Sequence, residues 1–157
     1  MRAYLPVIAK PHGFDVTAQI AEFVTLMRDD PQQQRERVMP HPVLMQVAQA
    51  RAEDLVQRDY MAHVDPDGLG PNWHVREGGY ALPDWYSQDP NANNIESIGG
   101  GYPAAINFWT AISTSPRHRD HALGLISFYA QQEQIGVGCA YRDGSRHSPA
   151  WVLLSTP

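Results

Sequence analysis

The hydrophobic period changes near the end of the chain, and this change restricts the possible folds more than any other feature. Two segments there, Ile135–Tyr141 and Ala150–Ser155, have the apolar pattern and length of strands, whereas earlier segments repeat apolar residues at helical spacing. Asp143-Gly144 lies in the loop between them, which indicates an antiparallel hairpin. Helices early and strands late, without regular alternation of the two, predict an α+β fold.

The predicted helices follow from spacing and from start signals. Proline suits the first turn of a helix, and serine before proline is typical of a helix cap, as at Ser115-Pro116. The expected helical segments are Val16–Met27, His41 or Pro42 to about Met61, Asn72–Gly78, and a helix that opens at Pro103. Residues 1–15 hold two prolines and one glycine and are expected to form an extended arm, so the predicted domain spans 16–157.

Length and composition fit one globular domain and exclude several classes of protein. The 157 residues are 43% hydrophobic and 18% charged, and the net charge of −5 provides no basic face for nucleic acid. No apolar run approaches the ~18 residues that a membrane-spanning helix needs. The run Tyr4–Ala9 is too short for a signal-peptide core, so we expect no signal peptide in this chain. Cys139 is the only cysteine, so no internal disulfide and no thiolate metal cluster can form.

Three short phrases contain the candidate functional residues. These are His63 within Tyr60–Gly68, Glu96 within Ile95–Gly101, and His118 within Ser115–Leu123. Two imidazoles and a carboxylate suit either a zinc-type site or an acid–base pair. The same residue types also form buried hydrogen-bonded networks that tie helices to a sheet. Both interpretations remain open on the residues alone.

In their order along the chain, these phrases resemble the CAP superfamily. Its SCP domain is shared by cysteine-rich secretory proteins, antigen 5 and plant pathogenesis-related proteins, and this chain is most similar to the short bacterial branch. The resemblance covers roughly Val16 to Ser155. The matching features are His63 before a proline/glycine turn, Gly79-Tyr80 followed by Glu96-Ser97-Ile98, Ser115-Pro-Arg-His-Arg119, Ile135-Gly-Val-Gly138 and Trp151.

Three positions depart from the family pattern. The Glu-Asn-Ile phrase of the family is Glu96-Ser97-Ile98 here, so the asparagine amide is lost. Ile112 stands where the family often has tryptophan, and Ser115 stands where eukaryotic members carry a second glutamate. The set of two histidines and two glutamates is therefore reduced to His63, Glu96 and His118.

The resemblance implies an α–β–α sandwich with a small antiparallel sheet, and a secreted or cell-surface location. It also implies a cleft in which His63, Glu96 and His118 hold a divalent metal, with zinc the expected ion. Three protein ligands would leave the fourth zinc position open to water or a ligand. Ser97, Ser115 and His121 are expected at the edge of this cleft, with His121 on the surface.

The family shares no single reaction, so the resemblance leaves three functions open. The first is a binding module for a small-molecule, peptide, glycan or lipid ligand, with the metal as part of the recognition surface. The second is a hydrolase in which metal-bound water, or Glu96 with His63 or His118, activates water against a peptide or cell-wall bond. The third is a lipid-binding module.

The surroundings of the candidate residues can also be predicted. His118 is expected in the first turn of a helix, where the dipole disfavours imidazolium, and His63 just past a helix C-terminus, where the dipole favours it. Glu96 is expected in an exposed cleft, so Glu96→Gln should barely change stability. The aromatic residues before Glu96 are expected to pack rather than to form an exposed rim. They are Trp73, Trp85 and Tyr86.

Overall fold

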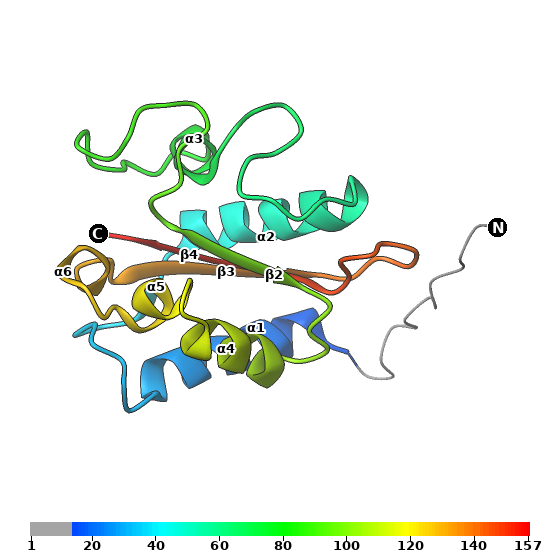
Figure 1. The fold of residues 1–157 in the computed structure, drawn as a ribbon, viewed down its shortest axis with the longest axis horizontal. Coiled ribbons are helices and arrows are strands. Elements are labelled where there is room, and N and C mark those ends of the chain that lie inside the picture. Colours follow the sequence, from blue (N-terminus) through cyan, green and yellow to red (C-terminus); the bar gives the residue numbers. More distant parts are fainter. Residues whose placement is uncertain (1–13) are drawn as a thin grey trace.

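A computed structural model describes residues 14–157 and shows a four-stranded sheet between two layers of helices (Figure 1). The elements are α1 (Val16–Asp29), β1 (Met39–Pro40), α2 (Pro42–Gln57), α3 (Pro71–Glu77), β2 (Glu96–Gly100), α4 (Ala105–Thr114), α5 (Arg119–Leu123), α6 (Ser127–Ala130), β3 (Gln134–Ala140) and β4 (Ala150–Thr156). This arrangement confirms the predicted α+β class and the α–β–α sandwich. Within residues 14–157, no helix has the length and apolar character needed to cross a membrane.

The sheet has the strand order β1-β3-β4-β2. β3 and β4 form the predicted antiparallel hairpin, with Val137 opposite Leu153. β2 pairs antiparallel with β4 and places Glu96 opposite Leu154. The short β1 pairs with β3 in parallel, so the predicted small antiparallel sheet has one additional parallel strand of two residues at its edge. No strand was predicted for the residues of β2, because Gly99 and Gly100 lower the strand propensity of this segment.

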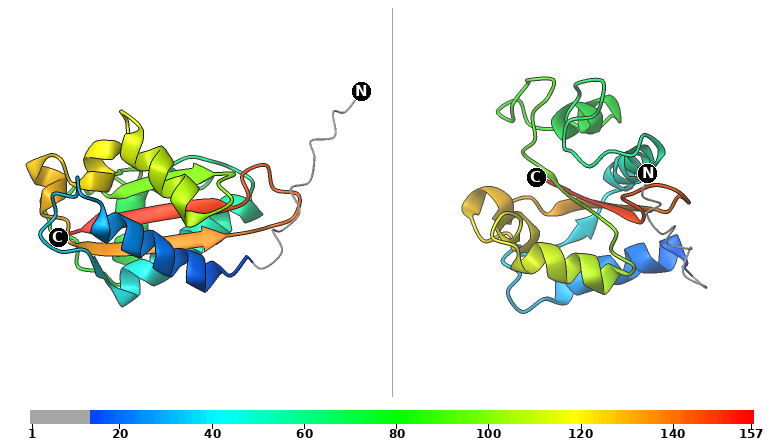
Figure 2. Two further views of the ribbon diagram at one scale, coloured as in Figure 1. Left: turned by 90° about the horizontal axis from the view of Figure 1, so that it is seen from below. Right: turned by 45° about the vertical axis from the view of Figure 1, so that its right-hand side comes forward.

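Helices cover both faces of the sheet (Figure 2), and a separate apolar core fills each side. On the side of α1 and α4, the Phe108 ring lies 5.4 Å from Phe23 and 5.6 Å from Trp151, between ring centroids. On the other side, α2 lies directly against β3. A Cβ atom at Gly136 or Gly138 would overlap the α2 backbone, so only glycine permits this close contact.

Helix α2 ends earlier than its apolar pattern predicts, at Gln57 rather than near Met61. Asp59 has a φ of 53°, in the left-handed region, which terminates the helix. Its carboxylate accepts hydrogen bonds from the Ser145 hydroxyl at 2.9 Å and from the Arg146 backbone N–H at 2.8 Å. The chain therefore leaves the helix well before His63, and the predicted dipole effect on His63 was based on a wrong helix end.

The first described residues already belong to the domain. Phe14 is part of the core beside α1, and the Asp15 carboxylate caps α1 by accepting from the Ala18 N–H at 3.2 Å. The rest of the predicted extended arm, residues 1–13, lies outside the described residues.

Candidate functional site

One cleft of about 280 Å³ brings the three candidate residues together. His63 comes from the loop after α2, Glu96 is the first residue of β2, and His118 is the N-cap of α5. Ser97 and His121 also line this cleft. Ser115 contacts it indirectly, through a hydrogen bond to His118. The structure thus places the predicted residues around one space, while their functional roles stay predictions.

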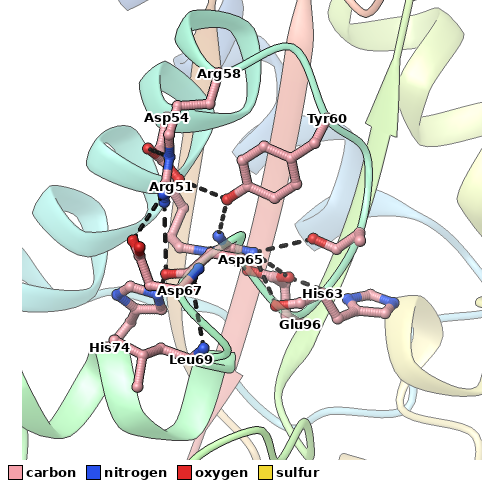
Figure 3. A network of polar contacts seen from close by, with 11 residues as sticks. Arg51, Asp54, Arg58, Tyr60, His63, Asp65, Asp67, Leu69, His74 and Glu96 are labelled. Carbon is pink, nitrogen blue, oxygen red and sulfur yellow. Dashed lines mark hydrogen bonds and ion pairs between the residues drawn. The ribbon is translucent and has the colours of Figure 1, made fainter.

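Arg51 binds Glu96 inside the protein, and the sequence analysis did not single out this arginine (Figure 3). Its Nε donates to Oε2 of Glu96 at 3.0 Å, and its second terminal nitrogen donates to Oε1 at 3.1 Å. The two side chains are 2% and 0% exposed. Although burial opposes the charge of Arg51, the neighbouring Glu96 raises the pKa of Arg51 above its usual range. The pair is therefore a buried ion pair with bidentate geometry.

A signal for Arg51 was available in the sequence of α2. Arg51 lies on the buried stripe of the helix, one turn from Ala48 and from Leu55. A charged residue on such a stripe is rarely fully buried unless it has a partner. The same guanidinium also donates to the Tyr60 hydroxyl at 2.7 Å and to the His63 carbonyl at 3.1 Å. It therefore connects α2, β2 and the loop that carries His63.

Glu96 orients the ring of His63. Oε1 of Glu96 lies 3.0 Å from Nδ1 of His63. Because both oxygens of Glu96 already accept from the Arg51 guanidinium, the group acts as an ionised acceptor and Nδ1 of His63 must donate. The neutral His63 ring then carries its proton on Nδ1. Its Nε2 has no hydrogen-bond partner among residues 14–157, and the side chain is 38% exposed.

His118 contacts the cleft from the connection between α4 and α5. Its Nδ1 lies 3.0 Å from the Ser115 hydroxyl, and that oxygen also accepts from the Arg117 backbone N–H at 3.4 Å. Burial lowers the pKa of His118, and the charges of His63 and Arg117 lower it further. The expected preference for the neutral ring is therefore present. Its expected cause was wrong, because α5 begins only at Arg119 and burial is the largest effect.

His121 is buried, contrary to the expectation of a surface residue at the edge of the cleft. It is 5% exposed, and the neighbouring Ser97 is 1% exposed. Nδ1 of His121 lies 2.7 Å from the Ser97 hydroxyl, and Nε2 lies 2.7 Å from the Ser155 hydroxyl. Ser155 donates its own proton to Gln132, so His121 donates from Nε2 and accepts at Nδ1. Burial, with a smaller contribution from Arg35, lowers the pKa of His121 well below its usual value.

Two further features lie near the cleft. Trp85 packs on Tyr86 with 4.4 Å between ring centroids, but it stays 61% exposed, so the expected packing is complete for Tyr86 and only partial for Trp85. A larger hollow of about 550 Å³ lies between α2 and α3. Three of its four carboxylates, Asp54, Asp65 and Asp67, pair with Arg58. We therefore place the candidate site in the smaller cleft, where two imidazoles present unbonded nitrogens.

The donor set does not fit the expected three-ligand zinc site. Both oxygens of Glu96 accept hydrogen bonds from Arg51, and one of them also accepts from His63. Among residues 14–157, no group of three His, Cys, Asp or Glu side chains is placed to hold a metal ion. Zinc remains an untested prediction, and in this arrangement three of the roughly four lone-pair sites of the Glu96 carboxylate are already used by Arg51 and His63.

Comparison with known proteins identifies the fold. No protein-family model and no curated protein sequence matches this chain. An outer surface protein of Borrelia burgdorferi has a similar structure, with a TM-score of 0.66 and 14% identity, over 91% of this chain and 95% of that protein. An extracellular protein of Bacillus anthracis strain Ames that contains an SCP domain matches 98% of this chain, with a TM-score of 0.69 and 14% identity.

This chain spans 45% of the length of the Bacillus anthracis protein, so the likeness concerns one part of a longer protein. At 14% identity, the two likenesses establish the fold and not the function. The SCP domain of the Bacillus anthracis protein is the fold that the resemblance of the sequence phrases predicted. The chain therefore has an SCP-type fold, as in the CAP superfamily.

Proposed function

We propose that this chain is a secreted or cell-surface SCP-type module that binds a small polar ligand in the cleft between His63 and His118. The observation that carries the proposal is that both rings line the cleft and that Nε2 of each has no hydrogen-bond partner within the described residues. The location is supported by the two similar structures, described as an outer surface protein and an extracellular protein.

The chemistry of the cleft defines the class of ligand. Of the residues that line it, only Ile95 has an aliphatic side chain, and a cleft of about 280 Å³ accepts one sugar ring or one or two amino-acid residues. An apolar acyl chain would find few partners there, so we do not propose the lipid-binding function. The charge of Glu96 is balanced by Arg51, so recognition depends on hydrogen bonds from the imidazoles and the nearby polar groups. The proposal does not require a bound metal.

The test is a titration followed by NMR at the imidazole signals. Dipeptides, N-acetylated amino sugars and phospholipid head groups would be added separately to the full chain. We expect one of the first two classes to shift the His63 and His118 signals in a saturable manner. The double variant His63→Ala/His118→Ala should lose this binding. His147→Ala is the control, since His147 does not line the cleft. Binding that persists in the double variant would refute the proposed site.

A further inference from the structure

We infer that His63, as general base, and His118, as hydrogen-bond donor to the oxyanion, form a metal-independent pair that hydrolyses a small ester or amide, with Arg51 as the positioning residue for His63. This activity goes beyond ligand binding, and it rests on the proposal that the same cleft accepts the ligand. The inference comes from the directions of the hydrogen bonds at the two rings. Those directions give the two imidazoles opposite roles.

His63 presents a lone pair to the cleft. Arg51 donates two hydrogen bonds to Glu96, and Glu96 accepts the proton-bearing Nδ1 of His63 at 3.0 Å. A ring held in this way has its unprotonated Nε2 directed away from the carboxylate. A carboxylate that fixes the tautomer of a histidine in this manner is the arrangement found in hydrolytic triads. His63 is therefore the base of the pair.

His118 presents a proton. The oxygen of Ser115 accepts from the Arg117 N–H and lies 3.0 Å from Nδ1 of His118, and we assign the hydroxyl proton of Ser115 to the hydrogen bond with that nitrogen. When Nδ1 accepts this proton, the neutral ring carries its own proton on Nε2. The exposed guanidinium of Arg117 lines the same cleft and adds positive charge beside that donor. His118 and Arg117 thus suit an oxygen that gains negative charge.

These assignments give a balanced reaction with water as the only co-reactant. Nε2 of His63 takes a proton from water as the water oxygen forms a bond to the carbonyl carbon. The electron pair of the carbonyl moves to its oxygen, which accepts a hydrogen bond from Nε2 of His118. The intermediate then collapses, the bond to the leaving oxygen or nitrogen breaks, and His63 returns the proton to the leaving group. The products are a carboxylic acid and an alcohol or amine.

Arg51 acts on this chemistry only through Glu96. Its side chain is 2% exposed, and it holds Glu96 with two parallel hydrogen bonds. With the guanidinium absent, the carboxylate would lose its fixed orientation and His63 would lose the partner that selects its tautomer. Arg51 is therefore a positioning residue and not a catalytic one.

The first test measures the tautomers of the wild-type chain by long-range ¹⁵N–¹H correlation. We expect neutral His63 to carry its proton on Nδ1 and neutral His118 to carry its proton on Nε2. Ser115→Ala should leave His63 unchanged and give His118 a mixture of tautomers. Arg51→Lys should remove the uniform tautomer of His63 if it folds. Finding wild-type His63 protonated on Nε2 would overturn the inference without any variant.

The second test measures hydrolysis of p-nitrophenyl acetate by the full chain in the presence of EDTA. We expect EDTA to have no effect and His63→Gln to lower kcat by about 100-fold or more. His147→Gln removes a histidine outside the cleft and should be unchanged. Hydrolysis that requires a metal, or that survives in His63→Gln, would overturn the inference. If ligands still shift the His63 and His118 signals, only the catalytic inference fails; if none does, the proposed binding site fails as well.

Discussion

The buried pair of Arg51 and Glu96 leads to a direct prediction about stability. In Arg51→Met, a side chain of similar length without charge replaces the guanidinium. The carboxylate of Glu96 stays in place, 0% exposed, with His63 as its remaining partner. The Tyr60 hydroxyl and the His63 carbonyl each lose a donor in the same change. The variant therefore removes one half of a buried ion pair and leaves the other half without its counter-charge.

The size of the effect follows from that geometry. Removing one partner of a buried ion pair costs about 3–5 kcal/mol, because the remaining charge is desolvated and unpaired. The chain has 157 residues, and domains of this size are stable by about 5–15 kcal/mol. We expect Arg51→Met to lower the free energy of unfolding by ~3–5 kcal/mol, a large share of the total. Glu96→Gln should also be clearly destabilising, in contrast to the near-neutral effect expected from the sequence.

Urea unfolding followed by far-UV circular dichroism measures this prediction. With a urea dependence of about 2 kcal/mol per molar, this loss of unfolding free energy lowers the urea concentration at the midpoint of unfolding by roughly 2 M. Arg58→Met is the matched control, because Arg58 caps the same helix and its hydrogen-bonded carboxylates, Asp54 and Asp67, are 29% and 67% exposed. The buried Asp65 lies 3.7 Å from Arg58 and keeps its closer partner His74 in this variant. Its midpoint should move much less. A loss below about 1 kcal/mol in Arg51→Met would refute the argument that this pair is buried and coupled.

Three further predictions concern the scaffold. Burial lowers the pKa of His121 in the folded chain, so below about pH 6.5 only the unfolded chain gains a proton at this residue. The free energy of unfolding should therefore fall by up to roughly 1.4 kcal/mol for each pH unit by which the pH is lowered. Urea unfolding at pH 7 and pH 5.5 should show this slope, and His121→Gln should flatten it. Gly138→Ala should cost at least about 1–3 kcal/mol in the same assay, since the added Cβ meets the backbone of Ala48. Trp85→Ala should change the melting temperature little, because Trp85 is 61% exposed and exposed positions contribute within about 0.5 kcal/mol.

The parts of the fold that the sequence predicted correctly are those with strong local signals. The β3–β4 hairpin has strand-like apolar runs on both sides of a turn, and the helices have either apolar spacing or proline at the start. β1 has two residues and β2 ends in two glycines, so both depend on pairing with distant strands. The end of α2 depends on Asp59, whose left-handed conformation is held by Ser145 and Arg146 across the fold.

The candidate site shows the same division between local and distant information. Short phrases located His63, Glu96 and His118: Glu96 begins β2, His118 is the N-cap of α5, and His63 lies in the loop after α2. The partner that decides the state of Glu96 lies 45 residues earlier, on the buried stripe of another helix. Burial of Glu96 and of His121 also arises only after the helices pack on the sheet. Position could therefore be predicted from the sequence, whereas charge state and burial required the three-dimensional arrangement.

A resemblance to a family thus predicts where a residue lies more reliably than it predicts the chemistry of that residue. Glu96 stands at the position that the motif marks, but both of its oxygens accept hydrogen bonds from the Arg51 guanidinium. Ser97 shows the same effect, because it stands where the family has asparagine and its hydroxyl bonds to the buried His121. In each case a residue outside the motif completes the hydrogen bonds of a residue inside it. We therefore expect the proposed function of this cleft to depend on Arg51 and His121 as much as on the three residues that the motifs mark.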